Sequence, residues 1–163
     1  MELSRILIRE LNDMQLIELR EVREAAGAED EARSFPIVIG LPEAMAIERR
    51  LKGVQIKRPQ THDLLASVIQ KLGARLESIT ISDLEDHTFY ATLDVRGADG
   101  SLIQIDSRPS DAIALGVAEN VPIFVDEDVL ERAGREPDPS ESAEPSEEGD
   151  DEDADERSDE DEE

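Results

Sequence analysis

The 163-residue sequence contains no cysteine and no tryptophan, and only four of its side chains are aromatic. Without cysteine, the chain forms no disulfide bond and has no thiolate metal ligand or cysteine nucleophile. It contains no run of 18 apolar residues, and its N-terminus lacks the apolar region of a secretory signal. We therefore expect a cytoplasmic protein without a membrane span, whose core is built from isoleucine, leucine and valine.

Basic residues are also scarce, because 17 lysines and arginines stand against 42 acidic residues, for a net charge of −25. Residues 135–163 hold 17 of these acids, two arginines, and no valine, isoleucine, leucine or aromatic residue. Such a segment cannot bury enough apolar surface to fold, so we expect one domain over 1–134 and a disordered acidic tail over 135–163. The tail is either a solvated appendage or an electrostatic mimic of nucleic acid.

The pattern of apolar residues along 1–134 predicts an α+β fold with a mixed, largely antiparallel sheet and about four helices. Alternation at 3–10 and 15–22, with Asn12-Asp13 between them, predicts a β-hairpin. We expect further strands at 35–39 and 121–125, a three-stranded meander at 75–83, 88–96 and 101–106, and helices at 42–51, 61–72, 109–118 and 127–133.

The helices are expected to be amphipathic. In the first, Met45, Ile47 and Leu51 should face the core. The second begins at Thr61 as its N-cap, ends at Gly73, and carries an apolar stripe. The stripe consists of Leu64, Leu65, Val68, Ile69 and Leu72.

Two segments share a pattern, an Arg-Pro step directly before a helix with an aspartate in the first helical turn. They are 58–63 (RPQTHD) and 106–111 (DSRPSD). Exposed backbone N–H groups at a helix N-terminus attract anions, so each segment is a candidate anion site. The same residues also fit a purely structural role, in which the aspartates complement helix dipoles and the arginines pair with them.

Residues with the chemistry for catalysis lie in these segments. His62 can act as a general acid or base near neutral pH. Asp63, Asp106 and Asp111 can supply hard oxygen ligands to a divalent cation. The sequence has no phosphate-binding glycine loop, no His-Glu-x-x-His zinc helix and no serine nucleophile elbow, which leaves a carboxylate-bound Mg²⁺ or Mn²⁺ site open.

Several separated motifs resemble the bifunctional nuclease (BFN) domain family. They are RPQTHDLLASVIQKLGA at 58–74, HTFYATL at 87–93, IDSRPSDAIALGV at 105–117, FPIVIGLPEA at 35–44 and VPIFVDEDVLE at 121–131. The resemblance implies a compact α+β domain that commonly self-associates. It also implies hydrolysis of phosphodiester bonds in DNA or RNA, so that nucleic acid would be a binding partner.

The resemblance supplies the motif positions, and we state their roles as hypotheses from the chemistry of the side chains. The catalytic residues would be His62, Asp63, Asp106 and Asp111. Phosphate would be held by Arg58, Arg108, Thr61 and Ser110, and the metal by Asp106, Asp111, Asp63 and Glu43.

This sequence departs from some family members, which carry a C-terminal helical motif where it has the acidic tail. A second hypothesis therefore stays open, in which the chain is a non-enzymatic, oligomeric module that binds an anion or a partner and is regulated by the tail.

Overall fold

The computed structural model describes residues 2–8, 14–22 and 33–134, and within them it confirms the α+β class. The expected turn at Asn12-Asp13 and the acidic tail lie outside the described residues. No helix in the described part of the chain is long and apolar enough to cross a membrane. The elements, in order, are β1 (Glu2–Ile8), β2 (Gln15–Arg20), β3 (Ser34–Ile39), α1 (Leu41–Leu51), α2 (Thr61–Lys71), β4 (Arg75–Glu85), β5 (Thr88–Arg96), β6 (Leu102–Ser107), α3 (Pro109–Gly116), β7 (Ile123–Val125) and α4 (Glu127–Ala133).

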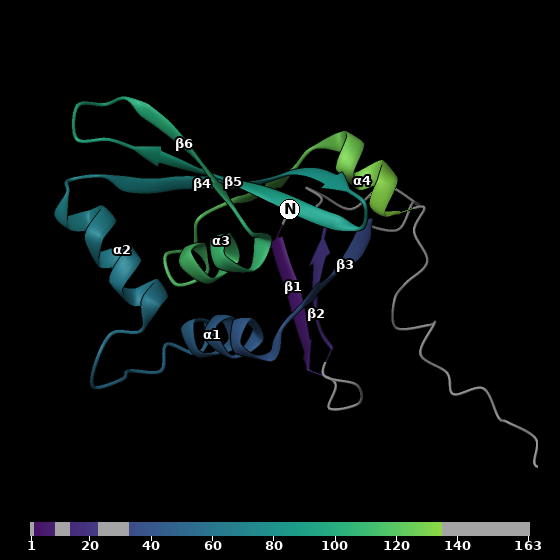
Figure 1. Ribbon diagram of the computed structural model, residues 1–163, viewed down its shortest axis with the longest axis horizontal. Helices are drawn as coiled ribbons and strands as arrows, with labels where there is room; N and C mark the ends of the chain where they lie inside the picture. Colours follow the sequence, from purple (N-terminus) through teal and green to yellow (C-terminus); the bar gives the residue numbers. More distant parts are fainter. Residues whose placement is uncertain (1, 9–13, 23–32, 135–163) are drawn as a thin grey trace, which may run out of the picture.

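The first three strands form an antiparallel sheet in the order β1-β2-β3 (Figure 1). The predicted hairpin is confirmed, since β1 pairs with β2 from Glu2 opposite Arg20 to Ile8 opposite Gln15. β3 is an edge strand, and its outer edge pairs with no described strand. After β3 the chain turns at Gly40 directly into α1. Pro36 fits such an edge, because a proline in a strand has no N–H to donate.

The second sheet has the order β6-β5-β4-β7. The predicted meander is confirmed, and β7 adds to β4 in parallel, with Ile79 opposite Ile123. Asp86 and His87 both have positive φ and join β4 to β5 in a two-residue turn, the conformation that suits a tight hairpin. The described strands therefore form two sheets, where the sequence analysis expected one. Alternation of apolar residues predicts where strands lie, but it does not predict which strands pair.

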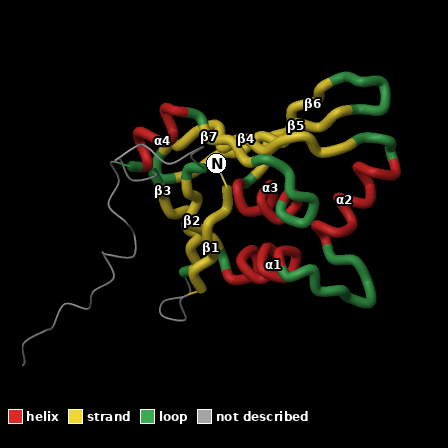
Figure 2. The backbone as a smooth tube through the Cα atoms, turned by 180° about the vertical axis from the view of Figure 1, so that it is seen from behind, coloured by secondary structure: helices red, strands yellow, loops and turns green. Residues whose placement is uncertain are grey.

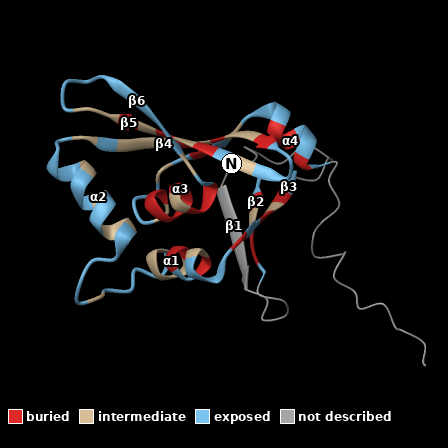
Figure 3. Cartoon of the chain, viewed as in Figure 1, coloured by how far each residue is buried: buried red, intermediate tan, exposed pale blue. Residues whose placement is uncertain are grey.

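Helix α3 lies between α1 and the four-stranded sheet (Figures 1 and 3). Seven of its eight residues are buried. A Cβ atom at Gly116 would lie 2.4 Å from Cδ1 of Ile79, so a larger residue at this close approach of α3 to β4 would force the Ile79 side chain to move. The largest fully buried side chains come from both sheets and from α1, α3 and α4: Ile17, Leu19, Ile47, Ile79, Ile81, Ile113 and Val129.

The prediction for α1 was correct for Ile47 and wrong for Met45 and Leu51, which are 58% and 49% exposed. Ala44 and Ala46 face the core instead. The core-facing side of α1 therefore consists of Ala44, Ala46 and Ile47, and Met45 and Leu51 lie on the outer side of the helix.

Helix α2 has no buried residue, although its predicted apolar stripe is present. Of the stripe, only Ile69 packs partly against the core, together with Ala66. The other four residues are exposed: Leu64, Leu65, Val68 and Leu72. The N-cap is Gln60 instead of Thr61, because the Asp63 carboxylate accepts the backbone N–H of Gln60 at 3.0 Å. Figures 2 and 3 show α2 at the side of the molecule, beyond α1 and α3.

Candidate functional site

The first Arg-Pro segment is attached to α1 through Asp63. Its Oδ2 accepts a hydrogen bond from Nη2 of Arg49 at 2.8 Å, and its Oδ1 accepts one from Nη1 of Arg50 at 2.6 Å. Arg50 is only 7% exposed, and it also donates to the backbone carbonyl groups of Ala114 and Leu115 in α3. These contacts hold the last turn of α1, the first turn of α2 and the end of α3 together.

Burial raises the pKa of Asp63, but the hydrogen bonds from the Gln60 backbone and from Arg49 and Arg50 outweigh it. The net result is a pKa below the usual aspartate value. The carboxylate is therefore ionised at neutral pH, and both of its oxygens are occupied by arginine or backbone donors.

The two Arg-Pro segments meet at Asp111. Nε2 of His62, in the first turn of α2, lies 3.1 Å from Oδ1 of Asp111 in the first turn of α3. Arg108 donates to the same carboxylate through Nε at 2.8 Å and Nη2 at 3.2 Å, and its Nη1 reaches Oε1 of Glu43 at 3.2 Å. We call His62, Asp111, Arg108 and Glu43 the junction cluster, because it joins the N-termini of α1, α2 and α3.

The protonation of this cluster follows from its hydrogen bonds. Burial raises the pKa of Asp111, but the contacts from Arg108 and His62 outweigh it and leave the pKa below the usual value. An ionised carboxylate can only accept, so Nε2 of His62 carries a proton. Nδ1 of His62 has no hydrogen-bond partner among the described residues, and in the neutral ring it is free to act as a base.

Arg108 is the exposed cation of the cluster. Its side chain is 65% exposed, and the hydrogen bonds that it donates to Asp111 and Glu43 raise its pKa further above the usual arginine value. A guanidinium in this position can make bidentate contacts with a phosphate. Two carboxylates already neutralise it, so an incoming anion has to replace one of them.

Five of the nine predicted site residues lie outside the junction cluster: Arg58, Thr61, Asp63, Asp106 and Ser110. Arg58, Thr61 and Asp106 are exposed, and their side chains make no hydrogen bond or ion pair with another described residue. Asp106 lies near the end of β6, opposite Thr92. Ser110 has a different environment, because it is buried at the start of α3.

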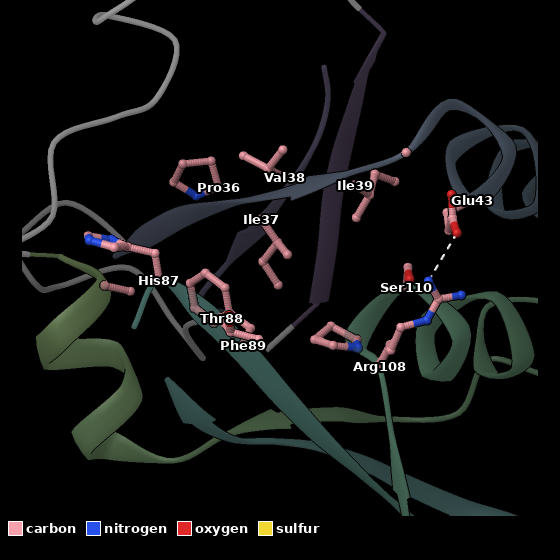
Figure 4. A pocket seen from close by; sticks show the side chains of 13 residues that line it. Pro36, Ile37, Val38, Ile39, Glu43, His87, Thr88, Phe89, Arg108 and Ser110 are labelled. Carbon is pink, nitrogen blue, oxygen red and sulfur yellow. Dashed lines mark hydrogen bonds and ion pairs between the residues drawn. The ribbon is translucent and has the colours of Figure 1, made fainter. Parts of the chain in front are cut away.

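A cavity of about 630 Å³ adjoins the junction cluster (Figure 4). Glu43, Arg108 and Ser110 lie at one end of it, and His87 and Thr88 lie at the other. Its walls are mostly apolar and come from β3, β5, α3 and α4: Pro36, Ile37, Val38, Ile39, Phe89, Pro109 and Ala133. Arg108 and Glu43 belong both to the cluster and to the cavity wall.

The carboxylates of the site provide few ligands for a divalent cation. Within the described residues, no three histidine, aspartate or glutamate side chains are grouped so that they could hold a metal ion. Asp111 and Glu43 are both bound by Arg108, and Asp63 is bound by Arg49 and Arg50. The expected Mg²⁺ or Mn²⁺ therefore remains a prediction, and no reaction step below depends on it.

Arg49 and Arg50 were missed by the sequence analysis. Basic residues in the last turn of a helix normally complement its dipole, so their spacing alone gave no reason to pair them with Asp63. Their position directly before the loop to the first Arg-Pro segment was the available signal.

The fold and these motifs define a family, and comparison with known proteins identifies it. The model of the bifunctional nuclease domain matches residues 27–138, and the chain belongs to this family. An uncharacterized protein of Mycobacterium tuberculosis strain H37Rv is 42% identical over 113 residues. That match covers 69% of this chain and 64% of the relative, so the chain spans less than two thirds of the relative's length.

A more distant plant relative has the name of a nuclease. "Bifunctional nuclease 1" of Oryza sativa subsp. japonica is 25% identical over 113 residues, covering 66% of this chain and 34% of the plant protein.

Proposed function

We propose that the chain hydrolyses phosphodiester bonds in RNA or DNA, and that the junction cluster is its active site. The observation that carries this proposal is the contact between His62 and Asp111. It joins two segments that are 49 residues apart in sequence and that were each a candidate anion site. Membership of the bifunctional nuclease domain family supports the same reaction class.

In the proposed reaction, Nδ1 of His62 takes a proton from a water molecule, whose oxygen then bonds to phosphorus. The bond from phosphorus to the leaving oxygen breaks, and that oxygen takes a proton from solvent. Asp111 is a positioning residue, because it fixes the proton on Nε2 and stabilises the imidazolium that forms. Arg108 would hold a non-bridging oxygen of the phosphate and offset its growing charge.

Glu43 competes with the substrate in this proposal. The phosphate needs the Nη1 donor of Arg108 that Glu43 occupies at 3.2 Å, and the Glu43 carboxylate repels it. Replacing Glu43 by glutamine keeps a hydrogen-bond acceptor and removes the negative charge. We expect E43Q to lower the KM for a short oligonucleotide, as a steady-state cleavage assay would show.

Charge also limits the form of the substrate. Residues 1–134 carry a net charge of −10 and residues 135–163 a net charge of −15, counted from the sequence. A long polyanion meets repulsion over most of this surface, and salt screens that repulsion. We expect short strands to be better substrates than long ones, and the difference to shrink at high ionic strength.

The test is cleavage of labelled RNA and DNA oligonucleotides by the full chain, in Mg²⁺, in Mn²⁺ and in EDTA. We expect H62Q, D111N and R108Q each to lower kcat by about a hundredfold or more. This is the loss that follows when an acid–base group or a charge-stabilising group is removed from an active site. The matched controls are D83N and R132Q, because Asp83 and Arg132 form a similar exposed pair at 2.7 Å outside the junction cluster. Both should retain the native rate.

Two results would overturn the proposal. The first is that the folded native chain cleaves no substrate under any of the three ion conditions. The second is that the three cluster variants cleave as fast as the controls. Activity that disappears in EDTA, together with loss in the cluster variants, would support the metal expected from the sequence.

A second candidate function is an oligomeric module that binds a partner without catalysis. It is favoured by the exposed apolar face of α2, which we define as Leu64, Leu65, Val68 and Leu72. An isolated helix of eleven residues is only marginally stable in water, so this face would gain from burial against a second copy of the chain. This candidate predicts self-association that depends on α2 and no cleavage.

A further inference from the structure

We propose that the cavity beside the junction cluster receives one unpaired nucleobase of the strand that is cleaved, which makes single-stranded nucleic acid the substrate class. This inference rests on the proposed function and adds to it a recognition site that the cleavage chemistry does not require. Its starting point is geometric, because Arg108 and Glu43 lie both in the cluster and in the cavity wall (Figure 4). A nucleotide whose phosphate is at Arg108 therefore has its base at the mouth of the cavity.

The cavity lies between two strand edges. The outer edge of β3 pairs with no described strand. On the opposite side, the pairing of β5 with β6 begins only at Ala91, opposite Ser107, so β6 does not reach the first three residues of β5. The space between these two edges is bordered by the branched side chain of Ile37 on β3 and by the aromatic ring of Phe89 on β5, and an aromatic ring is a surface on which a base can stack.

Hydrogen-bonding groups for the edge of a base are also present. Ser110 is only 5% exposed, yet its hydroxyl makes no hydrogen bond to another described residue, and it points toward β3 in Figure 4. On β3, the bond from Glu21 N–H to the Arg33 carbonyl shows that odd-numbered residues direct their backbone groups toward β2. Val38 therefore directs its N–H and C=O away from β2, along the edge that borders the cavity.

The size of the cavity selects against a duplex. A volume of about 630 Å³ is in the range of sites that bind small molecules, so it suits a single nucleotide. A base within a duplex reaches such a pocket only after it is unpaired and unstacked, at a cost of a few kcal/mol, whereas a base in a single strand is already free.

An extended peptide that adds a strand to β3 is the competing occupant. Strand addition depends on a row of backbone donors and acceptors along the edge. Pro36 has the same orientation as Val38 on this edge and has no N–H, so the edge lacks a donor that a peptide would need. The exposed guanidinium of Arg108 at the end of the cavity also suits a nucleotide phosphate.

The experiment measures cleavage by the full chain of one labelled oligonucleotide in three forms: single-stranded, in a duplex, and single-stranded with an abasic residue at one position. We expect the single strand to be cleaved about tenfold faster than the duplex, and cleavage beside the abasic residue to fall by about tenfold, the value of one stacked base. F89L removes the aromatic ring that borders the cavity and keeps an apolar side chain, so it should remove both differences. F124L, at an exposed position on β7 outside the cavity, is the control and should behave like the native chain.

A second readout does not depend on turnover. In the inactive H62Q chain, a single strand that carries a 2-aminopurine base should change its fluorescence on binding, and F89L in the same background should abolish that change. Equal cleavage of single strand and duplex by the native chain, unaffected by F89L, would overturn the base pocket while the nuclease proposal stands. Absence of cleavage with an intact fluorescence change would overturn the nuclease proposal and leave the pocket. Tighter binding of an alternating valine–threonine hexapeptide than of the oligonucleotide by the native chain would favour strand addition and overturn this inference.

Discussion

Helices α2 and α3 start from almost the same sequence pattern and end in opposite environments. Each follows an Arg-Pro step and has an aspartate at its third position, yet seven of the eight α3 residues are buried and none of α2 is. Helix α3 is covered by α1 on one side and by β4 and β5 on the other, whereas α2 contacts the body of the molecule along one side (Figures 1 and 3).

The two helices show what a local sequence pattern determines. The Arg-Pro step and the aspartate set where each helix begins and how its first turn is charged. They do not determine how much of the helix another element covers. The first turns meet through His62 and Asp111, so the candidate site lies where the buried helix and the exposed helix touch.

The largest expected effect on stability comes from truncating a buried side chain of α3. Ile113 of α3 is fully buried, so I113A should lower the free energy of unfolding by about 3–4 kcal/mol through lost transfer energy and the remaining cavity. The matched change on α2, L64A, removes a half-exposed side chain and should cost less than about 1 kcal/mol in the monomer. Urea unfolding at low protein concentration measures both. Equal losses would show that α2 is as well packed as α3.

Breaking the link between α1 and α2 should have the next largest effect. D63N removes the charge that pairs with Arg50, whose side chain is almost completely buried, and we expect a loss of about 2–3 kcal/mol in the free energy of unfolding. D83N is the control, because its partner Arg132 is exposed, and it should cost less than about 1 kcal/mol. The idea that Asp63 anchors α2 would be contradicted if the two variants unfolded alike.

Low pH should lower the free energy of unfolding through the same first turns of α2 and α3. Asp63 and Asp111 both have pKa values below the usual aspartate value in the folded chain. Their ionised forms therefore add stability at pH values above the unfolded pKa of about 4, and this contribution is lost as the pH falls through the folded values. Thermal unfolding from pH 7 to pH 2 measures this loss. In D63N, the acid-dependent part of the loss should be smaller, and an unchanged pH profile would mean that Asp63 contributes nothing to it.

The smallest effect on folding should come from the exposed face of α2. Serine at both Leu64 and Leu72 should change the free energy of unfolding of the monomer by less than about 0.5 kcal/mol, because both side chains are already in water. If this face binds a second copy, the same double variant should shift the sedimentation coefficient toward that of the monomer. L102S, an exposed leucine on β6, should leave association unchanged. Native and double-variant chains that sediment identically would remove α2 from any interface.

Much of this architecture could be predicted because local signals are strong. Pro42 and Pro109 start their helices, the turn at Asp86 and His87 joins two alternating strands, and Gly73 ends α2. The Arg-Pro segments gave most of the junction cluster, since His62, Asp111 and Arg108 were all candidates from spacing alone.

What could not be predicted depends on contacts between distant residues. The pairing of Asp63 with Arg49 and Arg50 depends on how the loop between α1 and α2 returns, and the cavity depends on the separation of the two sheets. The exposure of Met45 follows from which face of α1 packs against the core, and that face carries Ala44, Ala46 and Ile47. Periodicity predicts an apolar face, but it does not say what packs against it.

The most direct test of the central claim is the pH dependence of kcat for cleavage of a single-stranded oligonucleotide by the native chain, H62Q and D111N. A histidine base accepts a proton only when its ring is neutral, so we expect the rate to depend on pH. H62Q should lose that dependence, and D111N should change it while the control D83N keeps the native profile. The same pH profile in the native chain and in H62Q would contradict the account, because proton transfer would then occur without the junction cluster.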